Sequence, residues 1–295
     1  MESPTRTRKF RQSPTYSITE LCETLGVATS GFYAWKSRPP SRTARRRDAL
    51  RSKVQKAFHD SRGTYGSPRV RDELVDQGER VSRHLVAHLM RDAGLSARLK
   101  RPRRSTTDSS HNRGYAPNLL QRDFGAAAPN RVWVGDVTFI PTERGWVYLA
   151  AFLDLFSRRV VGFRLATHKR DELTITALER AFAVRQPTAG LIVHSDRGSE
   201  FASHGFRQVL KSHHAVQSMS RKADCYDNAV AESFFATLEK DLLQRTFFAT
   251  EPDAIAAITD YIHNFYNPVR RHSFNGNTSP ESFEASAAAM GATAA

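Results

Sequence analysis

Three acidic residues of this 295-residue chain have the types and positions that suit metal-dependent chemistry on phosphate esters. Asp136 interrupts an apolar stretch, Asp196 ends the apolar run GLIVHSD, and Glu232 follows after 35 intervening residues. A charge within an apolar strand is costly unless it is paired or bound to a metal. Carboxylate oxygens from separate elements, with no Cys or His among them, are the ligands that Mg²⁺ or Mn²⁺ prefers. Two such ions can activate an attacking hydroxyl or water and stabilise the leaving oxygen of a phosphodiester displacement.

Each acid also has a purely structural interpretation, which is the better one when the residue is taken singly. Asp136 can pair with an arginine, Asp196 can cap a turn, and Glu232 can be an ordinary surface residue of a helix. Asp154 interrupts a strand as well, but we expect it to pair with Arg158 and to support a hairpin. The catalytic interpretation therefore requires that the fold bring the three acids together.

A mixed α/β sheet can do so. Short runs rich in Val, Phe and Leu, separated by turn residues, predict strands, and the stretches between them predict helices. The predicted order is an antiparallel meander of strands at 131–140, 146–156 and 158–166, a helix at 171–184, a strand at 190–196, a helix at 199–211, a strand at 215–220, and helices at 228–243 and 251–266. This order suits an α/β fold with helices on both faces of a mixed sheet. If the first and fourth strands are neighbours, the three acids converge at one edge.

Two pairs of short helices are predicted before this core. In the first pair, Ser17 and Glu20 have the spacing of a capping box, and Gly26 ends the helix before a second one follows. In the second pair, the helices begin at the caps Ser67 and Ser82. Two helices joined around a glycine resemble a helix-turn-helix, although any small helical bundle gives a similar pattern. The presence of two such pairs favours a DNA-binding region.

These patterns divide the chain into five regions. The proline-broken basic run 38–47 is predicted as a linker that leads into a helix at 48–59, and residues 99–114, basic and then rich in Ser and Thr, are typical of a linker between domains. The regions are a helix-turn-helix-like N-terminus with its basic linker at 1–60, a second helix-turn-helix-like region at 61–98, a linker at 99–125, a catalytic core at 126–285 and a mobile tail at 286–295.

The positive charge lies almost entirely in the N-terminal part of the chain. Residues 1–130 contain 26 Lys and Arg against 12 Asp and Glu, which accounts for the whole net charge of +14, while the rest of the chain contains 18 of each. A segment of this kind is attracted to the phosphate backbone of nucleic acid through counterion release. The alternative is a solubilising surface, which is rarely so uneven.

Other sequence features exclude several classes of protein. The richest apolar stretch, 147–156, is shorter than the roughly 18 residues that span a bilayer. The N-terminus lacks the apolar core of a signal peptide, so we expect a cytoplasmic protein. Cys22 and Cys225 lie far apart and outside any Cys/His cluster, which argues against a disulfide framework and a zinc site, and we expect both to be reduced.

Five ordered motifs carry a resemblance to a known family. They are WVGDVTFI, YLAAFLDLFSRRVVG, HSDRGSEF, SRKADCYDNAVAESFFATL and YIHNFYNPVRRHSF. Together they resemble the OrfB-type catalytic subunit of bacterial insertion-sequence transposases, whose core is related to retroviral integrase, and the resemblance covers about residues 17–285. It implies a ribonuclease-H-like core in which Asp136, Asp196 and Glu232 are the metal-binding catalytic triad for two Mg²⁺ or Mn²⁺ ions.

The family nicks the ends of its DNA element to expose a 3′-hydroxyl, which then attacks another phosphodiester without a covalent protein intermediate. The resemblance further implies terminal repeats and target DNA as substrates, a small upstream DNA-binding partner of the OrfA type, a homo-oligomer on DNA, and a place at the bacterial nucleoid. In agreement, the core shows no Ser/His or Tyr nucleophile constellation.

Further residues are predicted to contact DNA, and one position departs from the family pattern. The predicted contacts are Arg69, Arg71, Arg83, Arg101, Arg103, Arg104, Arg197, Asn228, Lys240, Arg270 and Arg271. Asn228 has two alternatives, orienting Glu232 from one turn away or capping the helix. His194 is interpreted as a buried strand histidine. Where the family usually has a Lys seven positions after the catalytic Glu, this chain has Glu239, with Lys240 about 100° further round the helix.

Two other functions compete with the transposase interpretation. A DNA-binding regulator would use only the N-terminal helical pairs and would carry the core as an inactive relic, so its binding to DNA would not depend on metal. A metal-dependent nuclease would hydrolyse DNA or RNA–DNA hybrids without producing joined strands. The intact acids favour a transposase over a relic, and the two basic helical regions favour it over a free-standing nuclease.

Overall fold

The computed structural model describes residues 16–97, 114–221 and 225–293. The chain divides into two compact units, residues 1–52 and residues 53–295, and each is described by itself. In the part of the chain that the structure describes, no helix is both long and apolar enough to cross a membrane.

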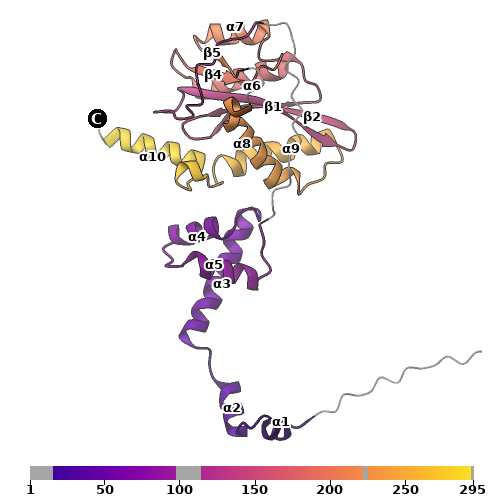
Figure 1. Ribbon diagram of the computed structural model, residues 1–295, viewed down its shortest axis with the longest axis vertical. Coiled ribbons are helices and arrows are strands. Elements are labelled where there is room, and N and C mark those ends of the chain that lie inside the picture. Colours follow the sequence, from indigo (N-terminus) through magenta and orange to yellow (C-terminus); the bar gives the residue numbers. More distant parts are fainter. Residues whose placement is uncertain (1–15, 98–113, 222–224, 294–295) are drawn as a thin grey trace, which may run out of the picture. The chain divides into compact units, whose positions relative to one another are not determined.

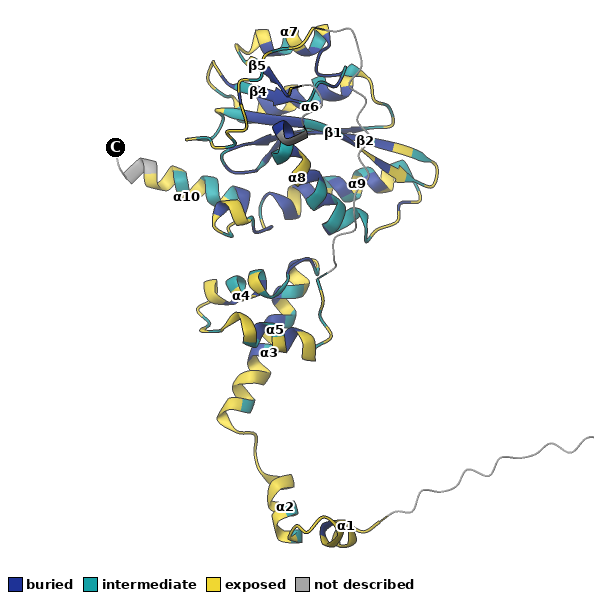
Figure 2. Cartoon of the chain, viewed as in Figure 1, coloured by how far each residue is buried: buried dark blue, intermediate teal, exposed yellow. Residues whose placement is uncertain are grey.

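The first unit consists of short helices. These are α1 (Ile18–Thr24), α2 (Thr29–Ser37) and the beginning of α3 (Arg42–Asp60). The predicted capping box is confirmed, because the Ser17 hydroxyl accepts from the Glu20 N–H at 3.2 Å and the Glu20 carboxylate accepts from the Ser17 N–H at 2.8 Å. Most of the described residues of this unit, 16–52, are exposed (Figure 2).

The sequence predicted a linker over the whole basic run 38–47, but only residues 38–41 lie outside a helix. Helix α3 begins at Arg42, so four of the arginines lie on its first turns. The Ser41 hydroxyl accepts the Ala44 N–H at 3.1 Å, which satisfies an amide at the start of the helix. Arg and Ala are also good helix formers, so the helix extends back as far as this cap.

The second unit opens with the predicted second helical pair, α4 (Ser67–Asp76) and α5 (Arg83–Asp92). Ser82 caps α5 as predicted, by accepting from the Leu85 N–H. The cap of α4 is Gly66 rather than Ser67, with Pro68 in the first turn. Val70 and Leu74 of α4 and Val86, Leu89 and Met90 of α5 form the buried side of the pair. The predicted linker at 99–114 falls, apart from Gly114, outside the described residues.

A five-stranded mixed sheet follows (Figure 1). Its strands are β1 (Val132–Thr142), β2 (Gly145–Asp154), β3 (Val160–Ala166), β4 (Ile192–Ser195) and β5 (Val216–Met219). The order across the sheet is β3-β2-β1-β4-β5, in which β1, β2 and β3 pair antiparallel and β4 pairs parallel with both β1 and β5. The antiparallel meander and the adjacency of the first and fourth strands are therefore as the sequence predicted.

Helices cover both faces of this sheet (Figure 1). One face packs against α6 (Asp171–Arg185) and α7 (His204–Ser212), with Trp133, Phe152 and Phe206 in the shared core. The other face carries α8 (Ala229–Leu238) and α9 (Glu251–Tyr261), each of which continues into a π-helical turn. The predicted α/β class is confirmed.

Two predicted boundaries in the core differ from the structure. Helix α7 starts at His204 rather than Ser199, because the Ser203 hydroxyl, not that of Ser199, accepts from the backbone of the first turn, at Phe206. Of the segment predicted as a mobile tail, 286–295, the described residues 286–293 form the last part of helix α10 (Pro280–Thr293). A run rich in alanine has high helix propensity, although its low sequence complexity is also typical of mobile segments.

Candidate active site

The register of β1 and β4 brings two of the predicted acids to neighbouring positions. Gly135 of β1 pairs with Ser195 of β4 in the parallel ladder. Asp136 and Asp196 are the residues that follow this pair. Asp136 accepts from the Val137 N–H at 2.7 Å, and Asp196 accepts from the Gly198 N–H at 2.9 Å. Since parallel neighbours run in the same direction, both carboxylates lie side by side at the edge of the sheet where β4 ends.

Helix α8 brings the third acid to this edge. The Asn228 amide at the start of α8 lies 3.5 Å from the Gly135 carbonyl oxygen of β1, and Glu232 follows one turn later on an exposed position. Burial raises the pKa of Asp196, and the negative charges of Glu200 and Glu232 raise it further, while the Gly198 N–H and a lysine lower it. A carboxylate whose pKa is raised by other carboxylates is a frequent feature of active sites.

The donor set fits a divalent cation, although the side chains as placed do not enclose one. Among the described residues, no three His, Cys, Asp or Glu side chains lie close enough together to hold one metal ion. The converging donors are nevertheless all oxygens, as Mg²⁺ and Mn²⁺ require. The Oδ1 atom of Asn228 is buried and has no hydrogen-bond partner in the described part of the chain, so a further side-chain oxygen is available four residues before Glu232.

Sequence reasoning missed Asp227, which orders the segment before α8. Its side chain is fully buried and accepts from Arg221, Arg122 and Asn118, at 2.8 to 3.2 Å. Hydrogen bonds from Arg221 hold the pKa of Asp227 well below its usual range. The partners of Asp227 lie up to 109 residues away in the sequence, so the sequence does not reveal them. The one available signal was that Asp227 and Asn228 stand shortly before Glu232 in the fourth motif.

His194 is a fully buried strand histidine, as predicted. Its ring nitrogens lie 2.8 Å from Ser218 Oγ and 3.0 Å from the Asp227 carbonyl oxygen. Burial lowers the pKa of His194 to about 4, so the ring is neutral at pH 7. The residue therefore supports the strands behind the acids.

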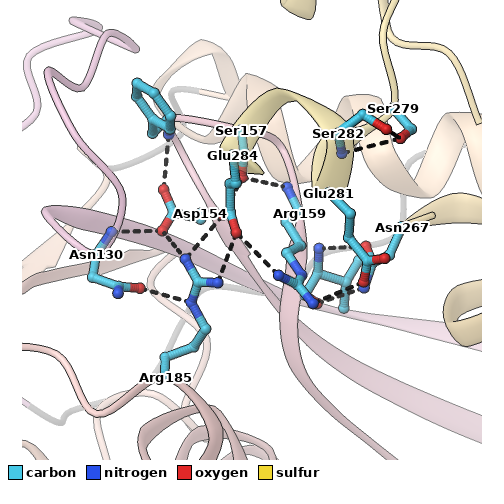
Figure 3. Close-up of polar contacts among 12 residues, drawn as sticks. Asn130, Asp154, Ser157, Arg159, Arg185, Asn267, Ser279, Glu281, Ser282 and Glu284 are labelled. Carbon is cyan, nitrogen blue, oxygen red and sulfur yellow. Dashed lines mark hydrogen bonds and ion pairs between the residues drawn. The ribbon is translucent and has the colours of Figure 1, made fainter. Parts of the chain in front are cut away.

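Asp154 belongs to a structural network of polar contacts at the end of β2, and its ion-pair partner differs from the one predicted (Figure 3). It is fully buried and accepts the Asn130 N–H at 2.7 Å and the Phe156 N–H at 2.9 Å. Its ion-pair partner is Arg185, at 3.5 Å, which also binds Glu284 of α10. The side chain of Arg158, the expected partner, instead donates to the carbonyl of Phe124.

The predicted DNA contacts differ in their exposure and in their partners. Arg71 and Arg83 are exposed, and Arg71 pairs with Asp72. Arg69 lies over the ring of Tyr65 and Lys240 is half-buried. The remaining arginines of the predicted linker, at 101, 103 and 104, fall outside the described residues.

Three further predicted contacts have protein partners. Arg197 donates to the Ser220 carbonyl at 2.7 Å. Arg270 is buried and bonds Asp241, and Arg271 is buried and binds Glu73 and Asp76 of α4. Both guanidinium groups are therefore used inside the protein, and the arrangement gives no support to their prediction as DNA contacts.

Comparisons with known proteins identify two kinds of domain. A family model described as an integrase core domain matches residues 126–225, a second integrase core model matches residues 214–280, and an HTH-like domain model matches residues 45–103. These matches agree with the predicted ribonuclease-H-like core and with the helical region that precedes it.

Curated relatives align over almost their whole length. The chain is 40% identical to the insertion element IS600 uncharacterized 31 kDa protein of Shigella sonnei, over 89% of this chain and 97% of that one. It is 38% identical to the transposase InsF for insertion sequence IS3A of Escherichia coli, over 91% of this chain and 94% of that one. Among solved structures, the HTLV-2 integrase catalytic core domain in complex with magnesium aligns over 54% of this chain and 98% of that one, at 20% identity and a TM-score of 0.43.

Proposed function

The chain belongs to the insertion-sequence transposases that carry an integrase core domain, and we propose that it nicks the ends of its element and transfers the exposed strands by metal-dependent transesterification at Asp136, Asp196 and Glu232. As a DNA transposase it is a polynucleotidyl transferase. The metal dependence, the triad and the order of the two steps are the proposal.

The observation that carries the proposal is the pairing of Gly135 with Ser195. Asp136 follows Gly135 on β1, Asp196 follows Ser195 at the end of β4, and α8 adds Glu232 from the layer that packs on β1. Two Mg²⁺ or Mn²⁺ ions would polarise the attacking hydroxyl and stabilise the leaving oxygen when bound. The three acids and Asn228 would hold them, with Asn228 oriented by the backbone of β1.

The chain's own groups determine where the phosphodiester lies. In joining, a 3′-hydroxyl attacks the phosphorus atom, and the new P–O bond forms as the bond to the leaving 3′-oxygen breaks. The proton of the hydroxyl passes to solvent, and the leaving oxygen takes up a proton from solvent. In the nick, water attacks in place of the hydroxyl. No protein nucleophile is needed, so the side chains bind and orient. Asp227 and its arginines keep the start of α8, and with it Glu232, against β1.

We further propose that the exposed basic faces of α3 and α5 bind the terminal repeats and that the enzyme works at the bacterial nucleoid in the cytoplasm. Arg83 on α5 and the arginines on the first turns of α3 are exposed. An upstream OrfA-type partner and a homo-oligomer on DNA are parts of the same proposal, because two element ends have to be held together for joining.

The test is strand cleavage and joining on labelled DNA that carries the element's own ends, with the upstream partner present, in Mg²⁺, Mn²⁺ or EDTA. We expect joined product in either metal, none in EDTA, and a loss of at least about a hundredfold in Glu232→Gln, since one charged group is removed from the reacting centre. Glu179→Gln, an exposed glutamate on α6, is the matched control and should react like the wild type.

Other outcomes would identify the competing functions. Metal-independent binding without cleavage, in wild type and Glu232→Gln alike, would favour the DNA-binding regulator. Hydrolysed DNA without joined strands would favour the nuclease. Glu239 is the first residue to revert to lysine if binding is normal and joining is weak.

A further inference from the structure

A fourth carboxylate, Glu200, lies beside the candidate triad. Its side chain is only 4% exposed although it belongs to the turn that follows Asp196. A Cβ atom placed on Gly198 would lie 2.9 Å from the Glu200 carboxylate and 3.0 Å from Asp196 Oδ1. The carboxylates of Glu200 and Asp196 therefore both lie against Gly198, and the absence of a side chain at Gly198 leaves room for them.

Lys169 compensates this concentration of negative charge. Its ammonium lies 3.1 Å from Glu200 Oε1, and the Ser199 hydroxyl lies 3.3 Å from Oε2. Lys169 also acts on Asp196, whose pKa its positive charge lowers. A buried carboxylate next to another one is unfavourable without such a partner.

The loop that carries Lys169 is attached to the same turn. Lys169 lies two residues before α6, and Thr174 in the first turn of α6 donates its hydroxyl to the Glu200 carbonyl at 3.3 Å. The carboxylate of Glu200 is buried, but the Lys169 side chain is 47% exposed. The ammonium of Lys169 can therefore be reached from solvent, as a group that binds substrate has to be.

We propose that Lys169 binds a DNA phosphate at the active site and that Glu200 is the positioning residue that holds its ammonium there. The inference rests on the proposed function, because it takes DNA as the substrate of this edge. It also accounts for the positive charge that is missing at Glu239, in the π-helical turn after α8, because the cation comes from the loop before α6 instead.

The first experiment measures binding of a labelled duplex with the element's own end sequence, in Ca²⁺, over a range of salt concentrations. Each phosphate contact adds about 0.9 to the slope of log K against log salt. We expect Lys169→Met to lower that slope by about 0.9 and to weaken binding about eightfold at 0.1 M salt. Lys169→Arg, which keeps the positive charge, should retain most of the salt slope and most of the affinity. Lys211→Met, an exposed lysine at the end of α7, is the matched control and should change neither.

The second experiment tests the positioning role of Glu200. If Glu200 acts through Lys169, then Lys169→Met should weaken binding by less than about twofold in a Glu200→Gln background, compared with about eightfold in the wild type. Thermal unfolding of each variant checks that the fold is intact, and a change in stability alone would not move the salt slope.

Each possible result decides the matter. A Lys169→Met slope equal to that of the wild type overturns the phosphate contact, and equal losses in the two backgrounds overturn the role of Glu200. If Glu200→Gln raises the Mn²⁺ concentration needed for half-maximal joining and Lys169→Met does not, Glu200 is a metal ligand and the positioning role is wrong. A wild type that binds with the full slope but joins no strands in Mg²⁺ contradicts the proposed function and leaves the Lys169 contact standing.

Discussion

His194 shows how a single buried residue behind the site makes the stability of the protein depend on pH. Burial lowers its pKa to about 4 in the folded chain, against about 6.5 when it is unfolded. Above pH 6.5 the ring is neutral in both states, so the fold has its full stability. Between pH 6.5 and about 4 only the unfolded chain takes up the proton, and stability falls by up to about 3 kcal/mol.

Urea unfolding at pH 7.0 and pH 4.5 measures this loss. His272, whose pKa is also lowered to about 4 by burial, contributes a similar share, so His194→Gln should remove about half of the histidine-dependent slope. An unchanged slope in His194→Gln would contradict the lowered pKa, because it would show that the ring takes up its proton equally in the folded and the unfolded chain.

The sequence predicts a functional residue well when its immediate neighbours in the chain make it unusual. It predicts a residue poorly when the role depends on a partner far away in the sequence. Asp136 and Asp196 stand out because each is a charge at an apolar strand, which is visible in one stretch of sequence. Glu200 and Lys169 are 31 positions apart, and neither is unusual until the fold brings them together. Arg271 is predicted from the sequence to contact DNA for the same reason, because its acidic partners on α4 lie far away in the sequence.

At the scale of elements, the close approach of β3 to α6 depends on one glycine. A Cβ atom on Gly162 would lie 2.5 Å from the Ala177 carbonyl oxygen and 2.6 Å from Ala181 Cβ. These atoms belong to the helix backbone and its first side-chain carbon, so they cannot rotate away. We expect Gly162→Ala to lower the free energy of unfolding by about 1–3 kcal/mol.

Gly205→Ala is the control for this substitution. Its new methyl group would meet only the Cδ1 end of Ile175, which can change rotamer, and alanine favours the helix. The unfolding free energy should therefore change by less than about 1 kcal/mol. Equal losses in the two variants would show that glycine is not required for the contact between strand and helix.

Strands were predicted more accurately than the beginnings of helices. Runs of Val, Phe and Leu between turn residues mark the strands within one short stretch of sequence, and all five predicted strands are present. Helix starts depend on which of several nearby hydroxyls accepts from the first turn. Ser199 and Ser203 are both suitable by sequence, and only the geometry of the glycine turn selects Ser203.

At the scale of the whole second unit, Arg271 joins the helical pair to the end of the core. It is 8% exposed, binds Glu73 and Asp76, and donates its backbone N–H to Tyr65. We expect Arg271→Ala to lower the free energy of unfolding by about 1.5–3 kcal/mol, since hydrogen bonds to charged groups are lost. Asp76→Asn, which alters an exposed partner, should cost less than about 1 kcal/mol.

The same variant tests the prediction that Arg271 contacts DNA. If its guanidinium serves only the α4 carboxylates, the salt slope of DNA binding should be unchanged in Arg271→Ala. A slope lower by about 0.9 would restore the residue to the DNA-binding surface.

The uneven charge of the whole chain predicts which part dominates the affinity for DNA. All of the net charge of +14 lies before residue 131, and Arg45 and Arg47 are exposed on α3. Replacing both by alanine should lower the slope of log K against log salt by up to about 1.8, because each phosphate contact releases counterions. Arg180→Ala with Lys211→Ala removes the same charge from exposed positions in the balanced part of the chain and should leave the slope within about 0.3 of the wild type. If the two double variants lose the same slope, binding follows net charge alone and α3 is not a docking surface. If only the Arg45 and Arg47 pair lowers it, the basic helix contacts the duplex while the core is left to act on the strand ends.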